Sequence, residues 1–224
     1  MRAAFFDLIG GASGNMLLGA FVDAGVDLDE IVKRLKTIPV DGWSIVSERT
    51  QRRGVDATYI DVVVPGEDDH HDDPEAHRHP PGRRTLADVI AIFEDSRLSR
   101  SQVARAITIA ERLAHAESQG TGVARDDLPF HPVGPIDAII DIAATCVAAE
   151  LLEIGRFFCS RFPAGRHLPG TDMVTATAAA ILSTLVERPG FHPAMQIESS
   201  GYGAGRSDFP MPNVTRIDIG RLLS

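Results

Sequence analysis

The sequence is poor in cysteine, in aromatic residues and in positive charge. Among 224 residues it has two cysteines, 6% aromatic residues and a formal net charge of −9. Two cysteines cannot form the disulfide framework of a small secreted protein. A negative net charge argues against a nucleic-acid-binding surface, which needs a basic face. No stretch of 18 apolar residues is free of charge, so we expect no transmembrane helix.

The cysteines and the first residues favour a cytoplasmic protein. Cys146 and Cys159 form no C-x-x-C pair, which fits a reducing compartment, and we interpret both as small buried hydrophobes. The opening segment meets an acid at Asp7, too early for a signal peptide. Neither Ser13 nor Ser200 lies in a G-x-S-x-G motif, so a hydrolase has little support.

Hydrophobic residues (44%) and charged residues (24%) occur in the proportions of a globular protein. Apolar periodicity predicts one α/β domain over residues 1–224, with a mixed sheet and packed helices. A strand, a glycine-rich turn and a helix open the chain. The expected strands are 3–8, 43–48, 55–64, 156–162, 194–199 and 213–219. The expected helices are 16–22, 27–38, 85–93, 99–113, 135–153 and 172–187.

Residues that favour helix starts sharpen this prediction. Asp27 with Glu30 resembles a capping box, and Ser99 with Gln102 is one of the S-x-x-Q type. Thr85 is expected to cap the helix at 85–93. This helix and the one at 99–113 are expected to form a helical hairpin over residues 85–120. The helix of small residues within 172–187 suits close packing inside one chain or between two, which leaves a homo-oligomer open.

A first candidate site is the glycine-rich turn after the opening strand. Glycine lets the backbone approach a ligand closely, and the free N–H groups at a helix start favour a phosphate or carboxylate. Asp7 stands at the carboxyl end of the strand, where α/β sheets place ligand groups. The alternative is a plain turn. The candidate residues that follow Asp7 are Gly10, Gly11, Ser13 and Gly14.

A second candidate is the most apolar helix of the chain. Asp137 and Asp141 are four residues apart and therefore share one face. A helix that is apolar nearly all round should be buried, so its carboxylates must find partners, protonate or meet a metal. Thr145 extends the same polar stripe. Alternatively, Asp137 simply complements the helix dipole.

A third candidate follows a strand with three alternating glycines, Gly201, Gly203 and Gly205. Such a segment predicts an open loop that can bind an anion, with Arg206 pairing to a phosphate. The alternative is a flexible connection between two strands.

A fourth candidate is a tract rich in histidine and acid between Glu67 and His79. Imidazole is a ligand that Zn, Ni, Cu and Co favour, and carboxylates add negative charge. We predict that residues 65–84 form a mobile loop, and a solvated acidic linker is the alternative reading. The candidate metal ligands are His70, His71, His77 and His79.

Taken together, these segments resemble the nickel-pincer-cofactor nickel-insertion proteins, the LarC family. The resemblance is carried in order by residues 6–20, by the His-rich insertion, by residues 130–142, and by residues 201–205 with Pro212 and Asn213. It implies insertion of nickel into a pyridinium dithiocarboxylate mononucleotide, in a CTP-dependent step that creates a carbon–nickel bond.

The resemblance also implies roles for the candidate residues. Matching positions assign Asp7, His131, Asp137 and Asp141 to the polar floor of the site. The histidine tract would collect Ni²⁺, and the glycine segments would face anionic groups. The likeness covers the family's N-terminal domain, which leaves two alternatives open: the CTP-associated C-terminal domain is a separate subunit, or the nickel-insertion function is lost.

Two departures from the family's pattern leave another function open. Asn15 stands where the family usually has Asp, and Pro132 where it usually has Glu, so each removes a carboxylate. The alternative is a divergent, non-catalytic protein that binds metal or nucleotide and serves a regulatory role. A third option is an unrelated nucleotide- or phosphate-binding enzyme built on the two glycine segments.

Overall fold

The computed structural model describes residues 1–65, 84–122, 136–162, 174–207 and 209–223. Over these ranges the chain forms a seven-stranded mixed sheet and six helices, which confirms the predicted α/β class. The strands are β1 (Arg2–Asp7), β2 (Ser44–Arg52), β3 (Val55–Val63), β4 (Arg156–Cys159), β5 (Val186–Pro189), β6 (Met195–Ala204) and β7 (Val214–Leu222). The helices are α1 (Gly14–Asp23), α2 (Leu28–Leu35), α3 (Leu86–Glu94), α4 (Arg100–Thr121), α5 (Ile136–Leu151) and α6 (Ala176–Leu185).

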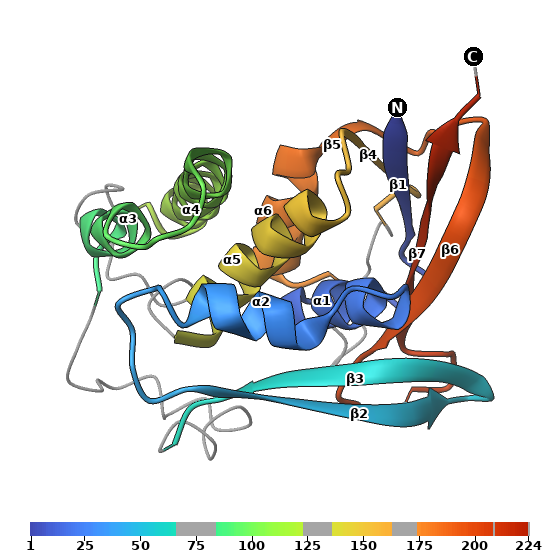
Figure 1. Cartoon of the computed structure of the whole chain (residues 1–224), viewed down its shortest axis with the longest axis horizontal. Coiled ribbons are helices and arrows are strands. Elements are labelled where there is room, and N and C mark those ends of the chain that lie inside the picture. Colours follow the sequence, from blue (N-terminus) through green and yellow to red (C-terminus); the bar gives the residue numbers. More distant parts are fainter. Residues whose placement is uncertain (66–83, 123–135, 163–173, 208, 224) are drawn as a thin grey trace.

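The strand order across the sheet is β2-β3-β6-β7-β1-β4-β5. β1 lies between the antiparallel β7 and the parallel β4, so its carboxyl end is held from both sides. β3 and β6 share only two register pairs, Thr58 with Gly203 and Tyr59 with Ala204. There the sheet turns from the upright strands β1, β7 and β6 to the hairpin of β2 and β3 (Figure 1).

The helices lie on the concave side of this sheet (Figure 1). α1 packs directly on β6 and β3, and α5 packs on α1, α2 and α4. α3 and α4 pack on each other farther from the strands, as the predicted helical hairpin requires. Capping boxes at Thr85 with Asp88 and at Ser99 with Gln102 begin these two helices.

The first strand is fixed by aromatic packing beneath it. Phe6 is fully buried and meets Phe21 of α1 edge-to-face, with ring centroids 5.6 Å apart. Such a pair contributes roughly 0.5–1.5 kcal/mol beyond its buried area. Because Phe6 points into the core, the next residue, Asp7, faces the opposite side of the sheet at the strand's end. Packing of one residue thus sets the direction of its polar neighbour.

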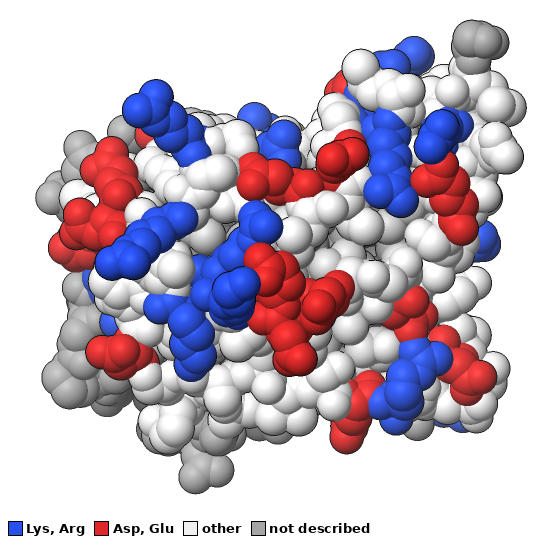
Figure 2. Space-filling model, viewed as in Figure 1, with Lys and Arg blue, Asp and Glu red and all other residues white. Residues whose placement is uncertain are grey.

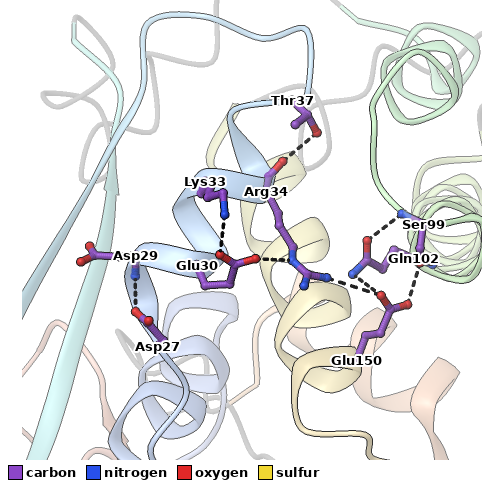
Figure 3. Close-up of polar contacts among 9 residues, drawn as sticks. All are labelled: Asp27, Asp29, Glu30, Lys33, Arg34, Thr37, Ser99, Gln102 and Glu150. Carbon is purple, nitrogen blue, oxygen red and sulfur yellow. Dashed lines mark hydrogen bonds and ion pairs between the residues drawn. The ribbon is translucent and has the colours of Figure 1, made fainter.

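Glu150 on α5 connects three helices through its carboxylate (Figure 3). It accepts hydrogen bonds from Ser99 Oγ at 2.6 Å and Gln102 Nε2 at 3.0 Å, and lies 3.5 Å from Arg34 Nη1. Burial alone would raise the pKa of Glu150. Hydrogen bonds from Ser101 and Ser99 and the nearby charge of Arg34 outweigh burial and lower that pKa. The contacts place α5 relative to α2 and α4.

Three local predictions are wrong. Asp27 caps α2 by accepting from Asp29 N, but Glu30 pairs with Lys33 and Arg34 instead of completing a capping box (Figure 3). The helix predicted over 172–187 stops at Leu185, and the chain passes at once into β5. The loop expected at 201–205 is largely strand, because β6 runs to Ala204.

Charged side chains of both signs are interspersed on the face shown in Figure 2. Within the described part of the chain, no helix is both long enough and apolar enough to cross a membrane.

Candidate functional site

The turn after β1 is built against β7. A side chain at Gly10 would collide with the backbone of Pro212 and Asn213, its Cβ falling 2.3 Å from the Pro212 carbonyl oxygen. Gly10 N donates to the Val214 carbonyl at 2.9 Å, and Thr215 Oγ1 donates to the Gly11 carbonyl at 2.6 Å. These contacts fix the course of the turn, so these glycines have a structural role whatever ligand the turn binds.

Two helix N-termini lie side by side after this turn. Ser13 caps α1 by accepting from Met16 N, and Thr175 caps α6 by accepting from Ala178 N. The residues before these caps, Ala12 and Val174, form a parallel β-bridge, and Thr175 N donates to the Ala12 carbonyl at 2.9 Å. First-turn N–H groups lack partners within their own helix and carry partial positive charge. The pair therefore favours an anionic group nearby.

Asp141 of α5 lies against the first residue of α1. A Cβ added to Gly14 would fall 2.1 Å from Asp141 Oδ2, so only glycine allows this approach. Asp141 is 8% exposed, and its Oδ1 is buried without a hydrogen-bond partner in the described part of the chain. Thr145, one turn further, is fully buried with an equally unpartnered Oγ1. The structure thereby brings the first and second candidate segments into contact.

The electrostatic surroundings of Asp141 favour its neutral form. Burial raises the pKa of Asp141 well above that of an ordinary aspartate, and the negative charges of Asp137 and Asp61 raise it further. The first turns of α1 and α6 contain no acidic residue. The described surroundings therefore favour the protonated form of Asp141.

Asp137 and Asp7 are only partly buried. Asp137 accepts a hydrogen bond from Ala138 N at 2.7 Å, in the first turn of α5, where a carboxylate complements the helix dipole. Asp7 ends β1 opposite Arg216 of β7 in the register. These two residues differ from Asp141, whose burial makes a charge far more costly.

The glycines of the third candidate allow helix and sheet to approach closely. A Cβ on Gly203 would fall 1.8 Å from the Met16 carbonyl oxygen, and one on Gly201 would fall 2.4 Å from that of Ala20. Spacing by two puts both on the face of β6 that carries α1. A Cβ on Gly205, just beyond the strand, would clash with the Asn213 side chain. Anion binding by these glycines stays a prediction.

Arg206 lies beyond β6 and is already paired. Its Nη2 donates to Asp61 Oδ2 at 3.2 Å, and a hydrogen bond with Tyr59 is the largest influence raising the pKa of Arg206. The side chain remains 57% exposed. An exposed pair of this kind contributes about 0–1 kcal/mol, so Arg206 remains available to an anion.

Five predicted residues lie outside the described ranges. Over the residues that the structure does describe, no group of three or more His, Cys, Asp or Glu is arranged to hold a metal ion. The histidine tract and His131 therefore remain predictions. The residues concerned are His70, His71, His77, His79 and His131.

The sequence predicted neither the influence of Asp61 on Asp141 nor the hydrogen bond between Asn15 and Ser13. Asp61 alternates with apolar residues on β3, which gives no sign that it influences Asp141 of a distant segment. Asn15 Oδ1 accepts from Ser13 Oγ at 2.8 Å, within the cap of α1. Both cysteines are fully buried as predicted, and burial raises the pKa of the Cys146 thiol to about 12.

The fold and the site define an α/β protein in which a buried carboxyl group meets the N-terminus of a helix beneath a mixed sheet. The chain belongs to the nickel insertion protein family, whose sequence model matches residues 4–171 and 167–221. No solved structure matches it.

Individual relatives support this membership. A pyridinium-3,5-bisthiocarboxylic acid mononucleotide nickel insertion protein of Thermotoga sp. (strain RQ2) is 35% identical over 98% of this chain and 61% of its own length. A protein of the same description from Geobacillus kaustophilus is 32% identical over 98% of this chain and 60% of its own. A relative from Dictyoglomus thermophilum is 30% identical over 100% of this chain and 62% of its own. The chain thus spans about three fifths of these relatives.

Proposed function

We propose that this chain acts in nickel insertion during biosynthesis of a nickel-pincer nucleotide cofactor, with a pyridinium-3,5-bisthiocarboxylic acid mononucleotide as its substrate. The observation that carries the proposal is membership of the nickel insertion family along almost the whole chain. The printed names of the Thermotoga and Geobacillus relatives supply the substrate. Nickel is the ion delivered, and the product is a nickel complex of the mononucleotide with a carbon–nickel bond.

The site offers groups suited to each part of that substrate. The mononucleotide carries a phosphate, which suits the adjoining N-termini of α1 and α6 at Ser13 and Thr175. The pyridinium ring is cationic and suits the carboxyl groups of Asp7, Asp137 and Asp141. We assign His131 to the same polar floor. Gly10 and Gly14 serve by close packing against Pro212 and Asp141, which holds the turn and Gly11 beside the ligand.

We further propose that the histidine tract supplies nickel to this floor. Neutral imidazoles bind Ni²⁺ well, and carboxylates between them attract the cation. The chain spans about three fifths of its relatives, and CTP binding is assigned to the portion of those relatives that it does not cover.

Reconstitution tests the proposal directly. The chain is combined with the mononucleotide, Ni²⁺ and CTP, with and without the C-terminal portion of the Thermotoga relative, and the nickel complex is identified by mass spectrometry. We expect the complex only when this chain is present. Product at equal yield without this chain would overturn the proposal.

A second candidate function is a non-catalytic regulatory protein that binds metal or nucleotide. Asn15 favours it, because its amide takes the place of a family carboxylate and is used within the helix cap. The same reconstitution separates the two functions. Binding of the mononucleotide or Ni²⁺ without any nickel complex would support the regulatory role, and product formation would exclude it.

A further inference from the structure

The polar stripe of α5 contains atoms that the fold does not satisfy. Asp141 Oδ1 and Thr145 Oγ1 are both buried without a hydrogen-bond partner in the described residues. A buried polar atom left without a partner costs roughly 1–3 kcal/mol, and native proteins keep few of them. The positions share one helix face, and the rest of α5 is almost entirely apolar. A stable fold alone gives no reason to keep a carboxyl group there.

The neighbours of Asp141 do not explain it as half of an ion pair. The charges identified as influencing it are Asp137 on α5 and Asp61 on β3, and both are negative. Asp141 contacts Gly14, the first residue of α1. The N-terminus of that helix partly offsets the cost of a negative charge on the carboxyl group. Asp141 as a residue is 8% exposed, although its Oδ1 is buried. Among the described residues, no positively charged partner neutralises the carboxyl group.

The reaction proposed above needs a proton acceptor. The two thiocarboxylic acid groups named in the substrate occupy ring positions 3 and 5, on either side of ring carbon 4. A nickel ion held by both sulfur atoms lies against that carbon. A carbon–nickel bond forms there only when the carbon releases its hydrogen as a proton. The positive charge of the pyridinium ring acidifies this C–H bond and stabilises a nearby carboxylate.

Resting on the proposed function, we propose that the Asp141 carboxylate accepts the proton from ring carbon 4 as nickel is inserted. The C–H electron pair becomes the carbon–nickel bond, and the proton forms a new O–H bond on Asp141. Nickel stays divalent, so the step needs neither an oxidant nor a reductant. The protonated carboxyl group then returns its proton to solvent before the next turnover.

The electrostatics of the site suit this role. General bases work best when their pKa lies near the operating pH, and aspartate in water is too weak a base for that. Burial, Asp137 and Asp61 all raise the pKa of Asp141, which strengthens it as a base. The cationic pyridinium ring and the Ni²⁺ ion oppose that rise once bound, so they promote the carboxylate form when the base is needed.

Hydrogen–deuterium exchange at ring carbon 4 tests the assignment. The mononucleotide is incubated with the chain in D₂O, and the ring proton is followed by NMR without metal and then with Ni²⁺, CTP and the C-terminal portion of the Thermotoga relative. We expect Asp141→Asn to slow proton loss by about 100-fold or more, the usual contribution of a general base. Asp29→Asn, on the exposed first turn of α2, is the matched control and keeps the wild-type rate.

The outcomes separate this inference from the proposed function. Wild-type rates in Asp141→Asn, with precursor still bound, would overturn the role of Asp141 and leave nickel insertion intact. If the wild type binds the mononucleotide but loses no ring proton, either without metal or with Ni²⁺ and CTP, both the role of Asp141 and the proposed function are overturned. If Asp141→Asn fails to fold, the wild-type pH profile decides. A rate that rises with pH through one ionisation above the usual carboxyl range supports the base, and a flat profile overturns it.

Discussion

At the residue scale, the chemistry of the site depends on how burial treats a single carboxyl group. Asp137 and Asp141 have the same side chain on the same helix. Asp137 is half-buried and accepts from a backbone N–H, whereas Asp141 is buried and its Oδ1 has no donor among the described residues. Desolvation penalises the ionised form of the second far more. Its identity as an aspartate therefore says less about its behaviour than the residues packed around it.

The stability of an Asp141→Asn variant should reveal this burial. Because the folded-state pKa of Asp141 is raised, the folded chain holds this proton more tightly than the unfolded chain. The wild type therefore loses stability relative to the variant as pH rises above about 4, by about 1.4 kcal/mol per pH unit, until the folded-state pKa is passed. Urea unfolding of both proteins between pH 5 and 8.5 measures the difference.

Asp88→Asn provides the contrast for that experiment. A backbone hydrogen bond from Thr85 lowers the pKa of Asp88, so its stabilising effect is lost only as pH falls below the usual carboxyl range. The stability difference of this variant should stay flat between pH 5 and 8.5. If the difference in unfolding free energy between the wild type and Asp141→Asn also stays flat over this pH range, Asp141 is not desolvated.

At the element scale, the close packing of α1 on β6 determines where the helix N-terminus lies. Gly203 has the Met16 carbonyl oxygen where its side chain would begin, so any larger residue must push the helix away from the strand. We expect Gly203→Ala to lower the free energy of unfolding by about 1–3 kcal/mol through overpacking. Urea titration followed by circular dichroism measures this.

Gly120→Ala is the matched control at this scale. Gly120 lies within α4, and nothing comes within 4 Å of its added Cβ. The same substitution there should raise stability by roughly 0.5–1 kcal/mol, because alanine has the higher helix propensity. Equal effects at the two positions would show that the close approach of α1 to β6 is not what requires glycine.

At the scale of the whole molecule, the proposed function joins a metal-collecting segment to a site on the sheet. Replacing His70, His71, His77 and His79 by alanine should weaken Ni²⁺ binding at least tenfold in calorimetry and leave the unfolding midpoint unchanged. Wild-type affinity should fall below about pH 6, where histidines protonate and cease to be ligands. Equal Ni²⁺ affinity in both proteins would rule out the tract as the metal site.

Much of this molecule could be predicted before any coordinates. The capping residues Thr85 and Ser99 located two helix starts, and apolar periodicity located six of the seven strands, because these signals act within a few residues. Strand β5 at 186–189 was missed, and its first two residues were assigned to the preceding helix. Its strand identity comes from pairing with β4, a partner that local sequence does not specify.

The sequence by itself determined that two aspartates share a face of a buried helix and that a glycine turn opens the chain, because both follow from spacing alone. Only the tertiary structure decided that Asp141, rather than Asp137, meets Gly14, and that the glycines of β6 admit a helix. Contacts between residues more than a hundred positions apart depend on how helices cross the sheet. That geometry follows from the packing of the whole core.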